Sequence, residues 1–87
     1  MEAIEEILKS YKHLRVVREL AINGPSTKYM LQKNTGIGPR ELGKALEILM
    51  RHGWVSRDDY RPHKYRLNEG REDVGMLLEL LRHHSYI

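Results

Sequence analysis

The chain has 87 residues, 40 % of them hydrophobic and 31 % charged, which is the balance of a soluble globular protein and not of a disordered one. A chain of this length buries about 64 % of its surface on folding, which is enough for one small core. The sequence contains no cysteine and no long apolar run, so we expect no disulfide, thiolate metal site, signal peptide or membrane span. A secreted mini-protein, a membrane protein and a two-domain enzyme are therefore not expected.

The net charge of +3 is distributed unevenly along the chain. Residues 23–37 carry two basic and no acidic side chains, and residues 38–66 carry seven basic and four acidic ones. Residues 1–22 are balanced, whereas residues 67–87 carry two basic and four acidic side chains. A basic middle region indicates an anionic partner, with nucleic acid as the first candidate. On charge alone, a solvated surface without a partner explains the pattern equally well.

Residues 2–22 predict helical structure, because they contain neither glycine nor proline and begin with three glutamates. Asn-Gly-Pro at 23–25 ends this region. At 100° per residue its apolar side chains form two stripes that point in different directions. The first stripe contains Ile4, Ile7, Leu8 and Tyr11, and the second contains Leu14, Val16, Val17, Leu20 and Ala21. One helix with two apolar faces, or two helices separated by a break near Ser10–Lys12, would give this pattern.

A short helix is expected next, from Lys28 to about Asn34. Thr27 precedes it and is a favourable N-cap residue. Met30 and Leu31 are expected to point inward from this helix.

A tight turn at 35–37 then leads into a longer third helix. Gly38 is a tolerable N-cap, and Pro39 is the residue type favoured at the first helical position. We expect this helix to continue to about His52 and to end at Gly53.

Beyond that glycine, the apolar period changes from 3.6 to 2, which is typical of strands. Residues 54–57 and 63–67 are therefore expected to form a two-stranded ribbon, joined by a polar loop at 58–62. Tyr65 and Leu67 alternate with basic residues and are expected to face the core.

This order of elements resembles that of winged helix-turn-helix proteins. The residues that carry the resemblance are Val16, Val17, Leu20, Thr27, Leu31, Gly36, Ile37, Leu42, Ala45, Leu46, Leu49, His52, Gly53, Trp54, Val55, Tyr65 and Leu67. The pattern is similar to that of small MarR, ArsR and PadR-like regulators, including archaeal and viral members, over about residues 14–70. It implies a mainly α fold with a small β-ribbon: a single winged-helix domain over 1–87, with flanking helical segments at 1–13 and 71–87. A winged helix can also bind protein, so the fold alone does not establish DNA binding.

In the resemblance, helix 39–52 takes the position of the recognition helix, which enters the major groove of DNA. Its cations Arg40, Lys44 and Arg51 lie almost opposite its apolar stripe, as reading of the groove requires. Arg40 lies in the first turn, where contact with a base edge is most plausible. Arg51 is expected to reach a phosphate or an acidic side chain elsewhere in the protein, and Glu47 to pair with Lys44 or Arg51.

The remaining candidates surround that helix. Gly43 leaves room for a sugar–phosphate backbone, and Arg61, beside Pro62 in the ribbon loop, suits a narrow minor groove. Asp58 is expected to form the turn. The complete set of predicted DNA-binding residues is Lys28, Tyr29, Lys33, Gly38, Pro39, Arg40, Gly43, Lys44, Arg51, Arg57, Arg61, Lys64 and Arg66.

The flanking segments predict a homodimer. The last helix, at 71–84, has a core stripe of Val74, Leu77, Leu78 and Leu81. Met76 and Leu80 widen this stripe beyond the arc needed to cover one core. The expected interface residues are Ile4, Ile7, Leu8, Tyr11, Val74, Leu77, Leu78 and Leu81. Packing of the two flanking segments on each other within one chain is the alternative.

These patterns together predict a dimeric, sequence-specific regulator of transcription that binds double-stranded DNA and is cytoplasmic, associated with the nucleoid. The alternatives are a segregation adaptor that coats DNA and a winged-helix module that binds protein. A salt series separates the last of these, because DNA binding weakens steeply with salt. The five histidines have no metal-ligand spacing and no catalytic motif is present, so we expect no enzyme activity, metal, cofactor or small-molecule ligand.

Overall fold

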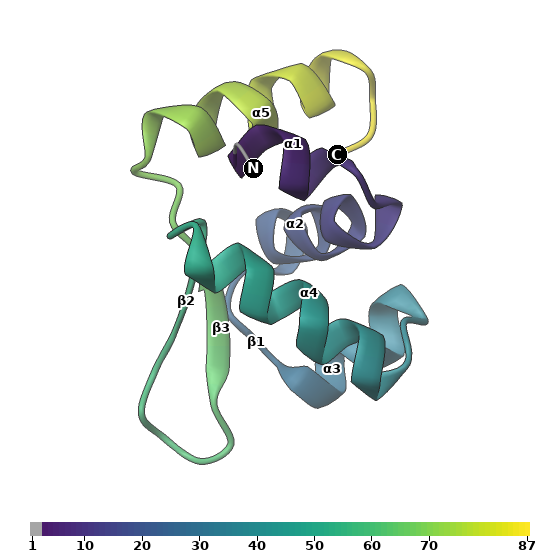
Figure 1. The fold of residues 1–87 in the computed structure, drawn as a ribbon, viewed down its shortest axis with the longest axis vertical. Helices are drawn as coiled ribbons and strands as arrows, with labels where there is room; N and C mark the ends of the chain where they lie inside the picture. Colours follow the sequence, from purple (N-terminus) through teal and green to yellow (C-terminus); the bar gives the residue numbers. More distant parts are fainter. Residues whose placement is uncertain (1–2) are drawn as a thin grey trace.

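The computed structural model describes residues 3–87, and within them it contains five helices and three short strands (Figure 1). In chain order these are α1 (Ala3–Leu8), α2 (Tyr11–Asn23), β1 (Ser26–Thr27), α3 (Lys28–Thr35), α4 (Pro39–Arg51), β2 (Val55–Arg57), β3 (Lys64–Leu67) and α5 (Glu72–His83). The strands form an antiparallel sheet in which β3 lies between β1 and β2. The protein is therefore mainly helical with one small sheet, as the sequence predicted. No helix in this described part of the chain is long and apolar enough to cross a membrane.

The break near Ser10 is real, and it explains the two apolar stripes of the N-terminal region. Ser10 is the N-cap of α2, where its Oγ accepts a hydrogen bond from the backbone N–H of Lys12 at 3.2 Å. The two stripes therefore belong to two helices. The buried His13 of α2 holds α1 in place, because its Nδ1 donates to the carbonyl oxygen of Ile7 at 2.9 Å.

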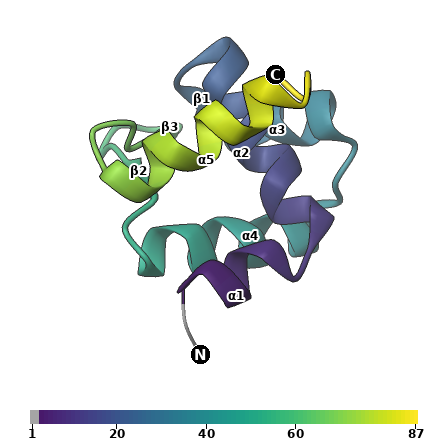
Figure 2. The same ribbon diagram turned by 90° about the horizontal axis from the view of Figure 1, so that it is seen from above.

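The core forms where α2, α3 and α4 pack together under α5 and the sheet (Figures 1 and 2). Its largest fully buried side chains come from every helix, from Trp54 just before β2, and from β1. They are Trp54, Ile7, Leu20, Leu31, Leu42, Leu46, Leu49, Leu78, Val16, Val17, Val74 and Ser26. The residues that carried the apolar periodicity of α2 and α4 are thus the residues that fill the core.

The turn between α3 and α4 agrees closely with the prediction. Thr27 Oγ1 accepts from the backbone N–H of Met30 at 3.2 Å and caps α3. Ile37 is buried in the turn, and Pro39 begins α4 after Gly38. The expectation for Met30 was wrong: it is 39 % exposed, because α3 is short and only Leu31 is fully buried in it.

Strand β1 was not predicted. Its two residues pair with β3, Ser26 opposite Tyr65 and Thr27 opposite Lys64. The other pairing, of β2 with β3, is the predicted ribbon. Tyr65 and Leu67 are buried as expected, so the inner face of the ribbon packs on the helices.

The predicted dimer interface needs correction. Ile7, Val74, Leu77 and Leu78 are buried inside this chain, and the fifth residue, Leu81, is partly buried against the same core. These side chains are not available to a second copy, because each is on the inward face of its own helix. Ile4, Leu8 and Tyr11 remain exposed, as do two residues outside the predicted interface, Met76 and Leu80.

The turn after α4 depends on Gly53. Its φ of 75° lies in the left-handed region, and a Cβ there would be 2.9 Å from Nη1 of Arg71. Asn68 ties this turn to the end of β3, because its Nδ2 donates to the carbonyl oxygen of Gly53 at 2.7 Å. The hairpin is thus held at a fixed position relative to α4.

We predict that Gly53→Ala lowers the free energy of unfolding, and the strain of a left-handed backbone at alanine by itself accounts for about 1–2 kcal/mol of this loss. Gly75→Ala is the control, because Gly75 lies inside α5 with nothing within 4 Å of its Cβ position. This control is expected to raise stability by up to about 1 kcal/mol through helix propensity. Urea unfolding measures both changes, and equal effects of the two substitutions would contradict this explanation.

Candidate nucleic-acid interface

The outer face of α4 is set by what its inner face buries. Leu42, Leu46 and Leu49 are buried against α2 and the sheet. The helical period then leaves Arg40 and Lys44 exposed on the opposite side. The N-terminal end of α4 and the hairpin loop lie at the same end of the molecule, while α1 and α5 lie at the other (Figure 1).

Lys28 adds a third cation to this face. The Nζ of Lys28, at the start of α3, lies 3.2 Å from the position of a Cβ on Gly43. The space beside Gly43 thus holds the end of an exposed lysine side chain, and the approach of a DNA backbone to this glycine stays a prediction. The missing side chain lets α3 place a charge on the surface of α4.

The cations of this face differ in their partners. Lys44 lies 3.8 Å from Glu41, which also lies 3.5 Å from Lys12 of α2. Both pairs are exposed, and such pairs contribute little and are readily exchanged. Within residues 3–87, Arg40 and Lys28 have no carboxylate within ion-pair distance. The first half of α4 therefore carries an excess of positive charge.

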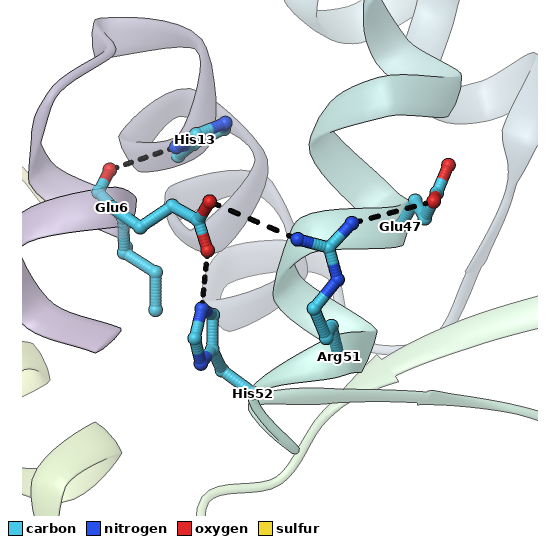
Figure 3. Close-up of polar contacts among 6 residues, drawn as sticks. Glu6, His13, Glu47, Arg51 and His52 are labelled. Atoms are coloured by element: carbon cyan, nitrogen blue, oxygen red, sulfur yellow. Dashed lines mark hydrogen bonds and ion pairs between the residues drawn. The ribbon is translucent and has the colours of Figure 1, made fainter. Parts of the chain in front are cut away.

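Arg51, at the end of α4, is exposed and is paired with two carboxylates. Its guanidinium lies 3.8 Å from Glu6 of α1 and 3.4 Å from Glu47 (Figure 3). Of the two roles predicted for Arg51, the structure shows the pairing with an acidic side chain. Arg51 therefore has one of its two expected roles, its contact with DNA stays a prediction, and Glu47 has the intrahelical pairing that was expected.

Glu6 also accepts a hydrogen bond from Nε2 of His52 at 2.5 Å, so one carboxylate joins α1 to the end of α4 (Figure 3). This hydrogen bond lowers the pKa of Glu6, with smaller contributions from the charges of His52 and Arg51; partial burial opposes the shift. The contact is between residues 46 positions apart, and no local pattern in the sequence indicates it.

The hairpin loop is shaped by Asp58, as predicted. One oxygen of its carboxylate accepts from the backbone N–H of Lys64 at 3.1 Å and from that of Tyr60 at 3.3 Å. Nδ1 of His63 donates to the carbonyl oxygen of Asp58 at 2.8 Å. Because this acidic group is used within the loop, the neighbouring Arg61 is left exposed at the tip.

The loop and α3 enclose a surface hollow of about 450 Å³. Lys28 and Tyr29 line it from the first turn of α3, and Arg61 and His63 line it from the loop. Residues separated by more than 30 positions are thus brought together beside α4. Thr27 and His63 also line this hollow. The sequence did not indicate that they would lie together, because the pairing of β1 with β3 was not predicted.

The structure therefore gathers only part of the predicted set. One end of the molecule carries α3, the start of α4 and the hairpin loop. The members of the predicted set that are exposed on these segments are Lys28, Tyr29, Lys33, Gly38, Pro39, Arg40, Lys44, Arg57, Arg61 and Lys64. Arg66 is exposed but lies toward the base of the hairpin, where it lines a hollow with Asn68 and Arg71. Arg51 lies at the far end of α4.

No group of three His, Asp or Glu side chains in the described residues is arranged to hold a metal ion. Comparison of the chain with family models, with curated proteins and with solved structures found no match. The function must therefore be argued from the arrangement of the residues alone.

The Glu6 contact predicts a pH dependence of stability. Folding lowers the pKa of Glu6 from its unfolded value of about 4.5. The ionised carboxylate therefore adds to the free energy of unfolding above that pH, and this added stability is lost as the pH falls through the pKa of the folded state. Glu6→Gln should therefore lower the free energy of unfolding at pH 7, and the difference from the unmodified chain should shrink below about pH 4. Glu5→Gln, at an exposed site on the same helix, serves as the control. A deficit equal at pH 7 and pH 3 in urea unfolding would contradict this role of Glu6.

Proposed function

We propose that this protein is a sequence-specific double-stranded DNA-binding protein of the winged helix-turn-helix class, which acts as a dimeric transcription regulator. Two features support the class. Helices α3 and α4 are joined by a three-residue turn with a buried Ile37, and a hairpin follows α4 directly. Winged helix-turn-helix proteins have the same order of elements, with the second helix of the pair as the recognition helix and the hairpin as the wing.

The observation that carries the proposal is the position of two cations at helix N-termini, neither of which has a carboxylate partner among residues 3–87. Lys28 begins α3, which has no acidic residue in its first turn. Arg40 lies in the first turn of α4 next to Glu41, whose carboxylate is paired with Lys12 and Lys44. The helix dipole disfavours positive charge there by about 0.3–1 kcal/mol. Stability alone gives no reason for such charges, whereas binding of an anionic backbone across both N-termini does.

In the proposed complex, the first half of α4 enters the major groove. Arg40 can pair with the O6 and N7 acceptors of guanine, and Lys44 can reach a base or a phosphate. Lys28 and Lys33 contact phosphates and fix the position of the domain without reading sequence. Arg61 extends from the loop toward the neighbouring minor groove, where a narrow A·T-rich segment attracts cations.

We predict that Arg40→Ala weakens binding to the preferred duplex by about 1–3 kcal/mol and relaxes the preference at one base pair. Lys33→Ala should weaken binding to all duplexes about equally. Arg51→Ala is the matched control: it removes the same side chain from the same helix, at the end that Glu6 and Glu47 neutralise. Fluorescence anisotropy with matched and single-mismatch duplexes measures these changes.

Equal losses for Arg40→Ala and Arg51→Ala would contradict the assignment of the first half of α4 to DNA. A salt series on the unmodified protein gives a second test, because phosphate contacts make log K fall linearly with the logarithm of salt concentration. Binding independent of salt would favour a protein partner.

For the dimer, we propose a contact of α5 with α5 of a second copy. Met76 and Leu80 are 62 % and 53 % exposed and lie one turn apart on its outer face. The first turn of α5 is acidic and the last turn is basic, with Arg82 and His83. Two antiparallel α5 helices related by a two-fold axis would therefore set each acidic turn opposite a basic turn of the other copy.

We predict that Leu80→Glu converts this dimer to a monomer, because it places a charge at the centre of the contact. Ile22→Glu is the control, since Ile22 on α2 is similarly exposed, at 51 %. Sedimentation at micromolar concentration measures the mass. A mass of 10.3 kDa for the unmodified chain would contradict the dimer and leave the DNA proposal to its own test.

A further inference from the structure

A second cationic surface lies on α2, away from the proposed DNA interface. A hollow of about 370 Å³ is lined there by Tyr11, Arg15 and Arg18 of α2, Asn34 at the end of α3, and Tyr86 near the C-terminus. Tyr86 lies against Arg18 in the middle of α2, and in Figure 1 the C-terminus lies at the end of the molecule away from the hairpin loop. None of these residues belongs to the predicted DNA-binding set.

Both arginines of this hollow are stacked on tyrosine rings. The Cζ atom of Arg15 lies 4.9 Å from the ring centroid of Tyr11, and that of Arg18 lies 5.0 Å from the ring centroid of Tyr86. Stacking fixes the plane of a guanidinium group and leaves the N–H groups at its edge free to donate hydrogen bonds. The hollow therefore contains two oriented donors of the kind that bind phosphate and carboxylate groups.

The two arginines outnumber the acidic groups of this hollow, since Glu19 is the single carboxylate among its described lining residues. Among the described residues, neither has a carboxylate within ion-pair distance. Glu19 is the acidic side chain in the lining, and its Oε1 accepts a hydrogen bond from the amide of Asn23. Because Arg15 and Arg18 are three residues apart on one helix, their side chains are neighbours and their charges repel. A bound anion would remove this repulsion.

We propose that this hollow binds a small phosphate monoester that carries a planar ring, of which a nucleoside monophosphate is the simplest example. Two adjacent guanidinium groups favour a dianion, and a phosphate monoester carries about −1.5 to −2 at neutral pH. A phosphodiester or a carboxylate supplies only one charge. Tyr11 is 61 % exposed, so it retains surface on which a ring can stack. This site is independent of DNA binding by α4.

The test is an NMR titration that follows the backbone amides and the arginine Nε–H signals of the intact chain. The three probes are adenosine monophosphate, its cyclic diester and adenosine, which share one ring and differ in charge. The monophosphate should shift the signals of Arg15 and Arg18 and bind at least about tenfold more tightly than either other probe. Equal affinity for the monophosphate and the cyclic diester, or shifts confined to α4, would overturn the proposal.

Variants give the second arm of the test. The double substitution Arg15→Ala with Arg18→Ala should weaken binding of adenosine monophosphate by more than about tenfold. Lys9→Ala, which removes an exposed cation that has no part in the proposed DNA or dimer contacts, should leave the affinity within about twofold. Arg15→Lys with Arg18→Lys keeps the charge but loses the planar donors, and an intermediate loss is expected. Circular dichroism checks the fold of each variant. Unchanged affinity in the folded alanine variant would overturn the proposal.

Discussion

The packing of α4 against α2 is the constraint on which the rest of the structure depends. Burial of Leu42, Leu46 and Leu49 fixes the rotation of α4 about its axis, and this rotation decides which of its side chains face solvent. The turn at Gly53 then starts the hairpin in a set direction, and Asn68 holds its base. The positions of Arg40 and of the hairpin loop are thus consequences of one apolar contact.

Electrostatic contacts then divide α4 into two unequal halves. Its first half receives the ammonium group of Lys28, because Gly43 has no side chain in the way. Its second half is neutralised by Glu6 and Glu47, which both lie beside Arg51. Helix α1 therefore has two roles. Its Ile7 packs in the core, and the carboxylate of its Glu6 reduces the positive charge at the end of α4 that is remote from the loop. In our proposal, this asymmetry directs DNA to the first half of the helix.

Local patterns in the sequence predicted most elements, whereas contacts between distant segments were not predictable. Periodicity and capping residues located α3, α4, the ribbon and α5, because each depends on neighbouring residues. Strand β1 has two residues, too few for any periodicity, and it exists only through pairing with β3. The helical wheel of α5 gave Val74, Leu77 and Leu78 correctly as its core stripe. Their additional assignment to a dimer interface was wrong, because the wheel does not show how much of a wide apolar arc the chain's own core covers. The pairing of Arg51 with an acidic side chain was among the expectations, but local patterns could not show that Glu6, on another helix, would supply it.

Selection of bound duplexes from a random DNA pool by the intact protein, at physiological salt, tests the central proposal most directly. If the first half of α4 reads base edges and the protein is a two-fold dimer, the selected duplexes should share a motif with dyad symmetry. Its half-sites should be separated by about 10 base pairs or a multiple of that spacing. A pool that stays unenriched after repeated rounds would contradict sequence-specific recognition by this face.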